Sequence, residues 1–380
     1  MELSGGASLS AGFHDQLMML ERKGRRRRLM LAGGHDFASN DYLALASSAE
    51  LKTAIVEALS RGVPVGAGAS RLLRGNHIEH ELLEEEAAIF FGSQSSLFFS
   101  SGFAANSTLL STLPQRGDII IHDELVHASS REGIRLARAP AIAARHNDAD
   151  AFADALAAWR RGGGRGAPWL VAESLYSMDG DVAPLDDLLR LAGAFDGFLI
   201  IDEAHATGLF GPGGRGLAAG MDGRENVITV RTCGKALGCE GALVCCPATI
   251  RDFLINRGRP FIFSTAPSPL MAAAVRAALR MLDEDCGRRQ QLQDLAAFAA
   301  DCLEPLGASG HGTQILPLIV GEDAPTMALA RKLQAQGFDV RGIRPPTVPD
   351  HSARLRISIS LNVDRRAIAA LGAALGEALA

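Results

Sequence analysis

Several side chains that could take part in chemistry come directly after short apolar segments of the chain. Lys235 stands in a glycine-rich turn just after one such segment, where lysine, a normally solvated residue, is unusual. Asp202 directly follows another segment, and Ser101 and Gly102 open a predicted helix after a third. A lysine amine can form a Schiff base with an aldehyde, and a carboxylate can pair with a protonated ring nitrogen. The N–H groups at a helix start can hold a phosphate.

These three groups together are what pyridoxal phosphate (PLP) requires of a protein. Each also has a structural explanation when considered alone, because Ser101 and Asp202 could be helix caps and Lys235 a surface lysine. His127 offers a flat imidazole that could stack on a planar ring, although a hydrogen-bonded structural histidine is the commoner case. The combination is more specific than its members and favours a PLP site.

Two nucleotide-binding patterns can be set aside. Asp202–His205 spells the DEAH sequence of helicases, but the upstream G-x-x-x-x-G-K-[ST] loop of a P-loop ATPase is missing. Gly66 and Gly68 are followed by Arg71, where a dinucleotide fingerprint needs glycine or alanine. A G-x-S-x-G nucleophile motif is also missing from the sequence. An ATPase, a dinucleotide enzyme and a serine hydrolase are therefore disfavoured.

The elements that must position these residues alternate along the chain between about residues 95 and 246. Near-continuous apolar runs of strand length are separated by stretches with helical period, which is typical of a mainly parallel sheet covered on both faces. Ligand-binding residues in such folds gather at the carboxyl ends of the strands. The predicted strands are Ser96–Ser100, Asp118–His122, Pro168–Ala172, Gly197–Ile201, Val227–Arg231 and Ala242–Cys246.

Two further regions flank this α/β segment. His14–Leu31 predicts an amphipathic helix that ends in the basic cluster Arg25–Arg28, which is either a solvated helix end or a contact to an anionic substrate. Leu270–Cys302 predicts one long helix, and a smaller α+β region follows it. We expect three parts: an N-terminal helix and arm (1–45), a large PLP-binding α/β domain (46–270) and a C-terminal α+β domain (271–380).

At these residues the chain resembles the α-oxoamine synthases, a PLP-dependent transferase family with the aspartate-aminotransferase fold, also called fold type I. The resemblance extends from about Phe37 to the C-terminus. It implies a mainly parallel seven-stranded sheet and a smaller α+β C-terminal domain. The matched motifs are Ser39–Leu43, Ser101–Asn106, His127–Ser129, Ser177–Gly180, Asp202–Gly208 and Thr232–Lys235.

The resemblance implies roles for individual residues at the cofactor. Lys235 would carry the cofactor, Asp202 would pair with its ring nitrogen, His205 would bond the ring hydroxyl, and His127 would stack on the ring. These four are the predicted catalytic residues. The other residues implied to contact the cofactor are Gly102, Phe103, Glu173, Ser177, Thr232 and, from a second subunit, Ser264 and Thr265.

The activity implied by the resemblance is the decarboxylative condensation of L-alanine with an acyl thioester, either pimeloyl-CoA or its carrier-protein equivalent. Arg356 would bind the amino-acid carboxylate, with Asn40 nearby and Arg22 on the thioester side. A homodimer with shared active sites is implied as well. Sister enzymes of the glycine C-acetyltransferase, 5-aminolevulinate synthase and serine palmitoyltransferase types stay open. Glu240 departs from the family pattern, which prefers a small residue near the phosphate.

Composition limits the remaining functional classes. The chain of 380 residues has a formal net charge of −5, so a sequence-independent nucleic-acid binder is not expected. The sequence contains no C-x-x-C pair, the spacing that would suggest a metal or redox site. No apolar run approaches the roughly 20 residues that span a bilayer. We expect a soluble cytoplasmic protein without a membrane or nucleic-acid partner. A regulator that only senses the cofactor is the main alternative to an enzyme.

Overall fold

The computed structural model describes residues 9–380, and the chain forms two compact units. The larger unit is Asn40–Gln293, and the smaller unit joins the residues up to Ser39 to Asp294–Ala380. These boundaries differ from the expected ones at residues 45 and 270. The N-terminal segment belongs with the C-terminal unit because its short strand β1 (His35–Asp36) pairs in parallel with β10 (Phe338–Asp339).

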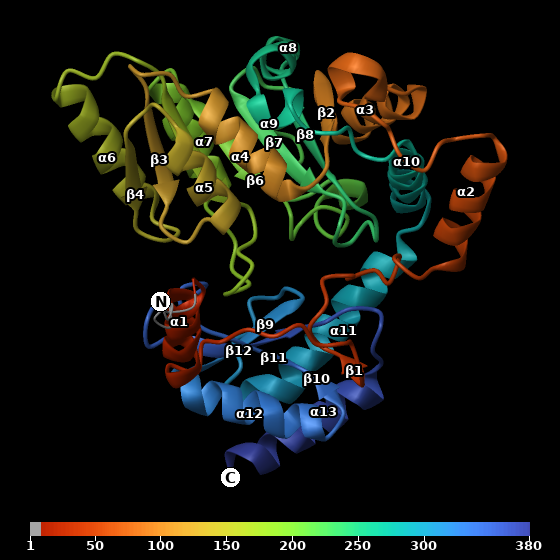
Figure 1. The fold of residues 1–380 in the computed structure, drawn as a ribbon. Helices are drawn as coiled ribbons and strands as arrows, with labels where there is room; N and C mark the ends of the chain where they lie inside the picture. Colours follow the sequence, from red (N-terminus) through yellow and green to blue (C-terminus); the bar gives the residue numbers. More distant parts are fainter. Residues whose placement is uncertain (1–8) are drawn as a thin grey trace, which may run out of the picture. The chain divides into compact units, whose positions relative to one another are not determined.

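The larger unit is built on a seven-stranded sheet (Figure 1). Strand β8 is antiparallel to both of its neighbours, and the pairings from β7 to β4 are parallel, so the expected mainly parallel sheet is confirmed. In spatial order the strands are β2 (Ser95–Phe99), β8 (Ala242–Cys246), β7 (Val227–Thr232), β6 (Phe198–Asp202), β5 (Pro168–Glu173), β3 (Ile119–Asp123) and β4 (Ala141–Ala144).

Both faces of this sheet are buried, because successive side chains of a strand point to opposite sides. In β3, Ile120 packs into a cluster with Leu109 and Leu110 of helix α4 (Gly102–Thr112). Its neighbours Ile119 and Ile121 pack on the other face with Phe152 and Leu156 of α6 (Ala149–Arg161). This two-sided burial explains why the strands are almost continuously apolar.

Several other helices complete the larger unit. The single helix expected over Leu270–Cys302 is wrong, because two helices separated at Asp285 and Cys286 take its place. The carboxylate of Asp285 accepts a hydrogen bond from the Gly287 N–H at 2.7 Å and so interrupts the run. The helices are α2 (Ala49–Ser60), η1 (Arg71–Gly75), α3 (Ile78–Phe91), α5 (Ala128–Leu136), α7 (Leu185–Ala194), η2 (Pro212–Gly214), α8 (Ala248–Arg257), α9 (Arg259–Ile262), α10 (Pro269–Glu284) and α11 (Gly287–Leu303).

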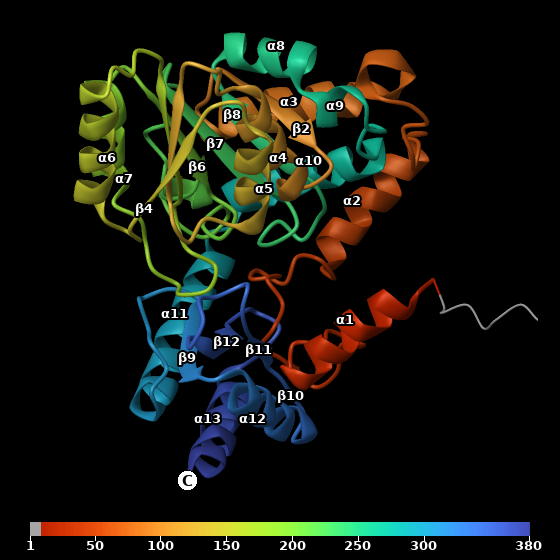
Figure 2. The ribbon, with the colours of Figure 1, turned by 60° about the vertical axis from the view of Figure 1, so that its left-hand side comes forward.

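In its described residues, the smaller unit contains a three-stranded antiparallel sheet, the α-helices α1, α12 and α13 and the short 3-10 helix η3, besides the part of α11 that it includes (Figure 2). The central strand β12 pairs with β11 on one side and with β9 on the other. The elements of the smaller unit, apart from β1 and β10, are α1 (Ala11–Arg22), η3 (Glu304–Leu306), β9 (Ile315–Gly321), α12 (Asp323–Ala335), β11 (Arg341–Ile343), β12 (Ala353–Ser358) and α13 (Arg365–Leu379).

Helix α1 is shorter than expected, because it ends at Arg22 and the basic cluster lies outside it. Gly24 adopts a φ of +65°, a backbone conformation that ends a helix. Beyond this turn Arg25 forms an ion pair with Asp323 at 2.6 Å, and Arg344 donates a hydrogen bond to the Gly24 carbonyl. Arg25, the first residue of the basic cluster, is therefore engaged within the smaller unit rather than placed along a helix.

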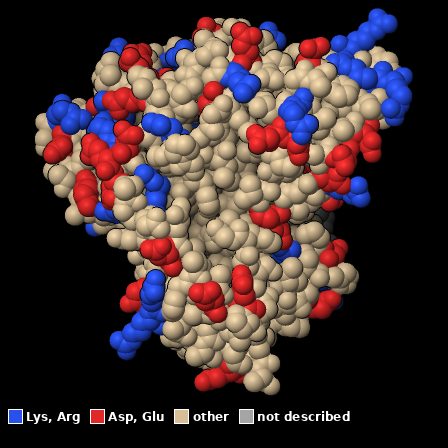
Figure 3. All heavy atoms as spheres, turned by 180° about the vertical axis from the view of Figure 1, so that it is seen from behind, with Lys and Arg blue, Asp and Glu red and all other residues tan. Residues whose placement is uncertain are grey.

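Two further features concern the charge of the surface and the hydropathy of the helices. On the face drawn in Figure 3, acidic and basic side chains are interspersed. Within residues 9–380, no helix combines the length and the apolar character that crossing a membrane requires.

Candidate active site

The carboxyl ends of the parallel strands meet at a cavity of about 490 Å³ in the larger unit. Residues that follow β2, β5, β6 and β7 line it, as expected for an open α/β sheet. The lining residues are Asn40, Ser100, Ser101, Gly102, Phe103, Asn106, His127, Ser129, Glu173, Asp202, Ala204, His205, Thr232, Gly234, Lys235, Cys239, Glu240 and Gly241.

The start of helix α4 forms one wall of the cavity. Ser101 caps the helix, since its side chain accepts a hydrogen bond from the Ala104 N–H at 3.1 Å. A Cβ atom added at Gly102 would lie 2.6 Å from Cγ2 of Thr232, so this position has room for glycine only. The close approach leaves the backbone of the first helical turn open to the cavity, where its N–H groups and the helix dipole favour an anion.

Asp202 at the end of β6 is buried and held by two donors. Its Oδ2 accepts a hydrogen bond from Nδ2 of Asn106 at 2.7 Å, and its Oδ1 accepts one from the Ala204 N–H at 3.0 Å. Two carboxylate oxygens offer about four acceptor positions. The carboxylate is therefore fixed in orientation and keeps acceptor capacity toward the cavity.

His127 precedes helix α5 and bends back over its first turn. Its Nδ1 lies 2.7 Å from Oγ of Ser129 and accepts a hydrogen bond from the Ser129 N–H at 3.2 Å. Burial lowers the pKa of His127, the charge of Asp202 raises it, and that of Lys235 lowers it. The net direction is downward, which favours a neutral imidazole at the cavity wall.

Glu173 at the end of β5 is the neighbour of Asp202 across the parallel pairing of β5 and β6. It is buried, and its Oε1 atom has no hydrogen-bond partner in the part of the chain that the structure describes. Burial, and next the negative charge of Asp202, hold the pKa of Glu173 well above its usual range. A protonated Glu173 can donate a hydrogen bond into the cavity.

His205 and Lys235 complete the polar wall. Nδ1 of His205 lies 2.7 Å from the hydroxyl of Tyr42, which also donates to Oδ1 of Asn40 at 3.0 Å. Lys235 lies in a tight turn after β7 that is closed by a hydrogen bond from the Gly238 N–H to the Lys235 carbonyl at 2.9 Å. The structure thus brings together nine of the predicted residues: Asn40, Gly102, Phe103, His127, Glu173, Asp202, His205, Thr232 and Lys235.

The other predicted residues do not line this cavity. Ser177 lies in the loop after β5, and Ser264 and Thr265 line a separate groove of about 390 Å³. Arg356 lies in β12 and Arg22 is the last residue of α1, so both belong to the smaller unit. Arg356 is buried and donates from Nη1 to Oγ of Ser358 at 2.7 Å.

Two residues of the cavity wall, Asn106 and Ser129, were part of the sequence motifs but received no role. A signal was present for Asn106, since asparagine is a poor helix former and stands here among buried positions of a helix. Glu240, which departs from the family pattern, lines the cavity and is exposed, so its charge is hydrated rather than buried beside the helix start.

Comparison with known proteins shows the family of the chain and agrees with its fold. The family described as "Aminotransferase class I and II" matches residues 33–372, and the chain therefore belongs to that family. Among curated relatives, the chain is similar to proteins named 8-amino-7-oxononanoate synthase. It is 43% identical to the one from Geobacter sulfurreducens over 90% of this chain and 88% of the relative. It is 44% identical to the one from Citrifermentans bemidjiense over 84% and 82% of the two chains.

Solved structures agree on the fold. An 8-amino-7-oxononanoate synthase from Francisella tularensis superposes with a TM-score of 0.75 at 28% identity, over 90% of this chain and 97% of that chain. A serine palmitoyltransferase from S. paucimobilis, solved with a bound PLP–myriocin aldimine, superposes with a TM-score of 0.87 over 100% and 99%. That second likeness, at 24% identity, concerns the fold alone. The predicted type I fold and the resemblance to PLP transferases are confirmed.

Proposed function

We propose that this chain is a PLP-dependent acyltransferase that condenses L-alanine with a pimeloyl thioester, with loss of CO2, to form 8-amino-7-oxononanoate for biotin synthesis. The observation that carries the proposal is the identity of 41–44% with synthases of that name over at least 84% of the chain. The cavity supports it, because the residues that such chemistry needs come from several strand ends and face one space.

The residues at the cavity fit PLP by three observations. The glycine at position 102 leaves a cradle at the helix start that a Cβ would fill. Glu173 has a buried oxygen without a partner among the described residues. A lysine and an aspartate also line the same wall. When bound, PLP supplies an aldehyde that can bond to an amine and a pyridine ring that withdraws electrons.

The side chains of this protein would divide the work as follows. Lys235 would hold the cofactor covalently and then carry a proton to and from Cα of the substrate. The negative charge of Asp202 would keep the ring nitrogen protonated, and His127 would cover the ring face. His205 would bond the ring hydroxyl. Gly102, Phe103 and Thr232 would hold the phosphate, and a protonated Glu173 would offer a hydrogen bond at the reacting centre.

Arg356 is the proposed binding group for the alanine carboxylate, with Asn40 as a further contact and Arg22 on the thioester side. A guanidinium can bind a carboxylate through two parallel hydrogen bonds, which an ammonium cannot do. Because one charge-assisted bond is worth about 1.5–3 kcal/mol, Arg356→Ala should weaken alanine binding by roughly ten- to a hundredfold. Spectral titration with L-alanine measures this, and unchanged affinity would remove Arg356 from the site. Arg356→Lys should restore the affinity only in part.

A homodimer with shared active sites is the proposed assembly. Ser264 and Thr265 line a groove whose rim exposes Phe263, Leu72 and Leu73, with relative exposures of 72%, 51% and 79%. Exposed apolar side chains that cluster in this way are typical of an interface. Through it these two hydroxyl residues would reach the phosphate of the other subunit. Sedimentation tests the assembly, and a fully active monomer would contradict it.

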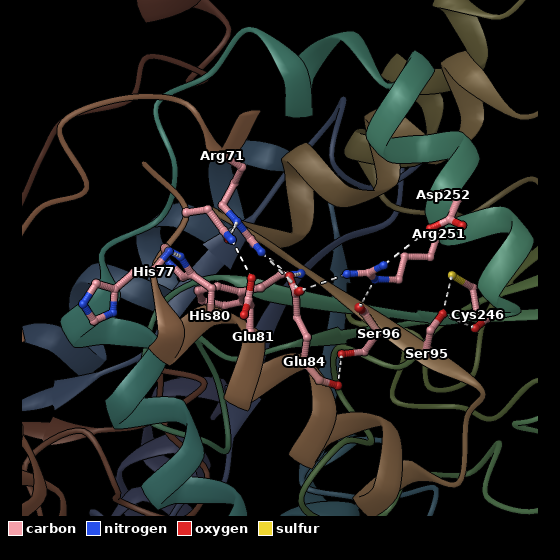
Figure 4. Close-up of polar contacts among 12 residues, drawn as sticks. Arg71, His77, His80, Glu81, Glu84, Ser95, Ser96, Cys246, Arg251 and Asp252 are labelled. Carbon is pink, nitrogen blue, oxygen red and sulfur yellow. Dashed lines mark hydrogen bonds and ion pairs between the residues drawn. The ribbon is translucent and has the colours of Figure 1, made fainter. Parts of the chain in front are cut away.

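Buried contacts hold this rim in a fixed shape (Figure 4). Two guanidinium nitrogens of Arg71 donate to the carboxylate of Glu84 at 2.8 and 3.2 Å, which fixes the turn that carries Leu72 and Leu73. His80 bonds the Pro267 carbonyl through Nε2 at 2.8 Å, next to the Ser264 and Thr265 segment. Burial lowers the pKa of His80 to about 4, so it is neutral under ordinary conditions.

The proposed reaction is tested by identifying the product. The purified protein, loaded with PLP, is incubated with alanine, glycine or serine and with several acyl thioesters, and the products are identified by mass spectrometry. Formation of 8-amino-7-oxononanoate from alanine and a pimeloyl thioester is the expected result. A clear preference for glycine or serine would assign a sister activity, and a protein that binds no PLP would exclude the whole class.

A further inference from the structure

Two residues without an assigned role connect the two groups that would contact the cofactor ring. The side-chain amide of Asn106, on helix α4, has two hydrogens and uses both. One is donated to Oδ2 of Asp202 at 2.7 Å, and the other to Oγ of Ser129 at 3.0 Å. Ser129 in turn lies 2.7 Å from Nδ1 of His127. Asp202 and His127 are thus joined through two intervening side chains.

The direction of each bond in this chain is determined by its donors. The Ser129 N–H can only donate, so the Nδ1 atom that it contacts must be an acceptor. The Ser129 hydroxyl accepts from Asn106 and therefore has its own hydrogen available for Nδ1 of His127. The neutral imidazole then carries its proton on Nε2. Every donor in the series points from Asn106 outward, to Asp202 on one side and to His127 on the other.

A purely structural role for Asn106 is poorly supported by its surroundings. Asn106 is 2% exposed inside a helix, where alanine is intrinsically preferred by up to about 0.7 kcal/mol. The contact between helices α4 and α5 also has a separate hydrogen bond, from the Ser107 hydroxyl to the Ser129 carbonyl at 3.2 Å. Joining the two helices therefore does not require the Asn106 amide.

We propose that Asn106 and Ser129 are positioning residues that fix Asp202 and His127 relative to each other, so that one cofactor ring can meet the carboxylate at its nitrogen and the imidazole at its face. The inference rests on the proposed function, because it assumes that a flat, protonated heterocycle occupies the cavity. Asn106 fixes the orientation of the Asp202 carboxylate, since its N–H donates to Oδ2. Ser129 sets the tautomer and the angle of His127.

The test compares Asn106→Ala with Ser107→Ala, which removes one hydrogen bond between the same two helices and leaves the series intact. Apoprotein is titrated with PLP, and the dissociation constant is measured by absorbance. We expect Asn106→Ala to raise this constant about tenfold or more, because a bond to a charged group is lost. Ser107→Ala should leave it unchanged. If wild-type apoprotein bound no PLP, the proposed function would fail before this inference was tested.

Two measurements distinguish a positioning role of Asn106 and Ser129 from a role in the stability of the fold alone. Nitrogen NMR of wild-type His127 should show protonated Nε2 and bare Nδ1, and a proton on Nδ1 would overturn the inference. Asn106→Asp keeps the shape and covers the case in which the alanine variant does not fold. At acid pH the new carboxyl can donate to Asp202, whereas at higher pH two carboxylates would repel each other. Relative to wild type, the PLP affinity of Asn106→Asp should therefore fall as pH rises, and a profile parallel to that of wild type would contradict the proposal.

Discussion

Asp202 and Glu203 are consecutive acidic residues at the end of β6, yet they belong to regions with opposite properties. Asp202 faces the cavity, where it has two protein donors and remaining acceptor capacity. Glu203 faces the protein interior and is fully buried against Arg231 at 3.2 Å. Its carboxylate also accepts hydrogen bonds from the N–H groups of Leu217 and Ala218 at 3.0 and 2.7 Å.

The interior region consists of Glu203, Arg231 and Asp222, and the charges of these residues are paired with one another. Arg231 pairs with Asp222 at 2.6 Å as well as with Glu203, and its Nε donates to Oγ1 of Thr229 at 3.2 Å. The cavity, by contrast, contains the buried, unpartnered oxygen of Glu173. Polar groups that are paired within the protein stabilise a fold, whereas a buried oxygen without a partner at a cavity wall is open to a ligand. Asp202 and Glu203 are adjacent in the sequence, but they differ in whether protein groups satisfy all of their hydrogen-bonding capacity.

The largest effect on stability should come from breaking the interior region. Arg231→Met would leave Glu203 and Asp222 buried without a counter-charge, which typically costs about 3–5 kcal/mol of unfolding free energy. Urea unfolding measures this change. The exposed pair of Arg135 and Glu132 provides a control, since Arg135→Met should cost no more than about 1 kcal/mol. If Arg231→Met were as stable as that control, the contrast between the regions would be wrong.

The cavity region should respond in the opposite way. Asp202→Asn keeps the shape of the side chain and removes its charge, so we expect product formation to fall by about two to three orders of magnitude. The exchange of the alanine α-hydrogen in D2O should slow in parallel. The free energy of unfolding should fall by only about 1–3 kcal/mol, because one donor then faces the new amide NH2 but no buried counter-ion is left behind. A variant with wild-type exchange would show that the charge has no electronic role.

A third buried cluster, centred on His146, should show a smaller effect on stability that depends on pH. His146 bonds Asp123 at 3.0 Å and Asp181 at 2.8 Å, and its ring contacts that of Tyr176. Burial lowers the pKa of His146, but the two carboxylates outweigh it and raise the pKa to about 10. Asp181 lies in the loop after β5 that also carries Ser177, so this cluster holds that loop to β3.

The sign of the pH dependence follows from the raised pKa. The stabilisation by His146 should be complete below its unfolded pKa of about 6.5 and should be lost as pH rises toward 10. The difference in unfolding free energy between wild type and His146→Gln should therefore shrink from pH 6.5 to pH 10. Urea titrations at several pH values test this, and a constant difference would contradict the assignment of a charged His146.

Much of the sheet could be predicted from sequence because its strands are buried on both faces. Strand β4 escaped prediction, since Ala141–Ala144 is short, rich in alanine and exposed at three of its four positions. The break between α10 and α11 depends on one local hydrogen bond, which the Asp285 carboxylate accepts from the Gly287 N–H. Hydrophobic periodicity carries no signal for such a bond. The α13 helix (Arg365–Leu379) was likewise not predicted.

The candidate site was predicted best where the fold itself brings residues together. Asp202, Glu173 and Lys235 follow neighbouring parallel strands, so their convergence follows from topology. Ser264 and Arg356 could be assigned only by resemblance. Ser264 lines a separate groove and Arg356 belongs to the smaller unit, and no sequence pattern relates either position to the end of a strand. The Asn106 series was missed because it depends on the side-chain geometry between α4, the start of α5 and the end of β6.

The most direct test of the central claim is the identity of the lysine that carries the cofactor. The chain has only four lysines, Lys23, Lys52, Lys235 and Lys332, so the candidates are easily separated. PLP-loaded protein is reduced with borohydride, digested and mapped by mass spectrometry. We expect the pyridoxyl mass on Lys235, together with a complete loss of turnover in a Lys235→Ala variant that folds normally. Cofactor mass on any other lysine, or turnover in that variant, would contradict the central claim.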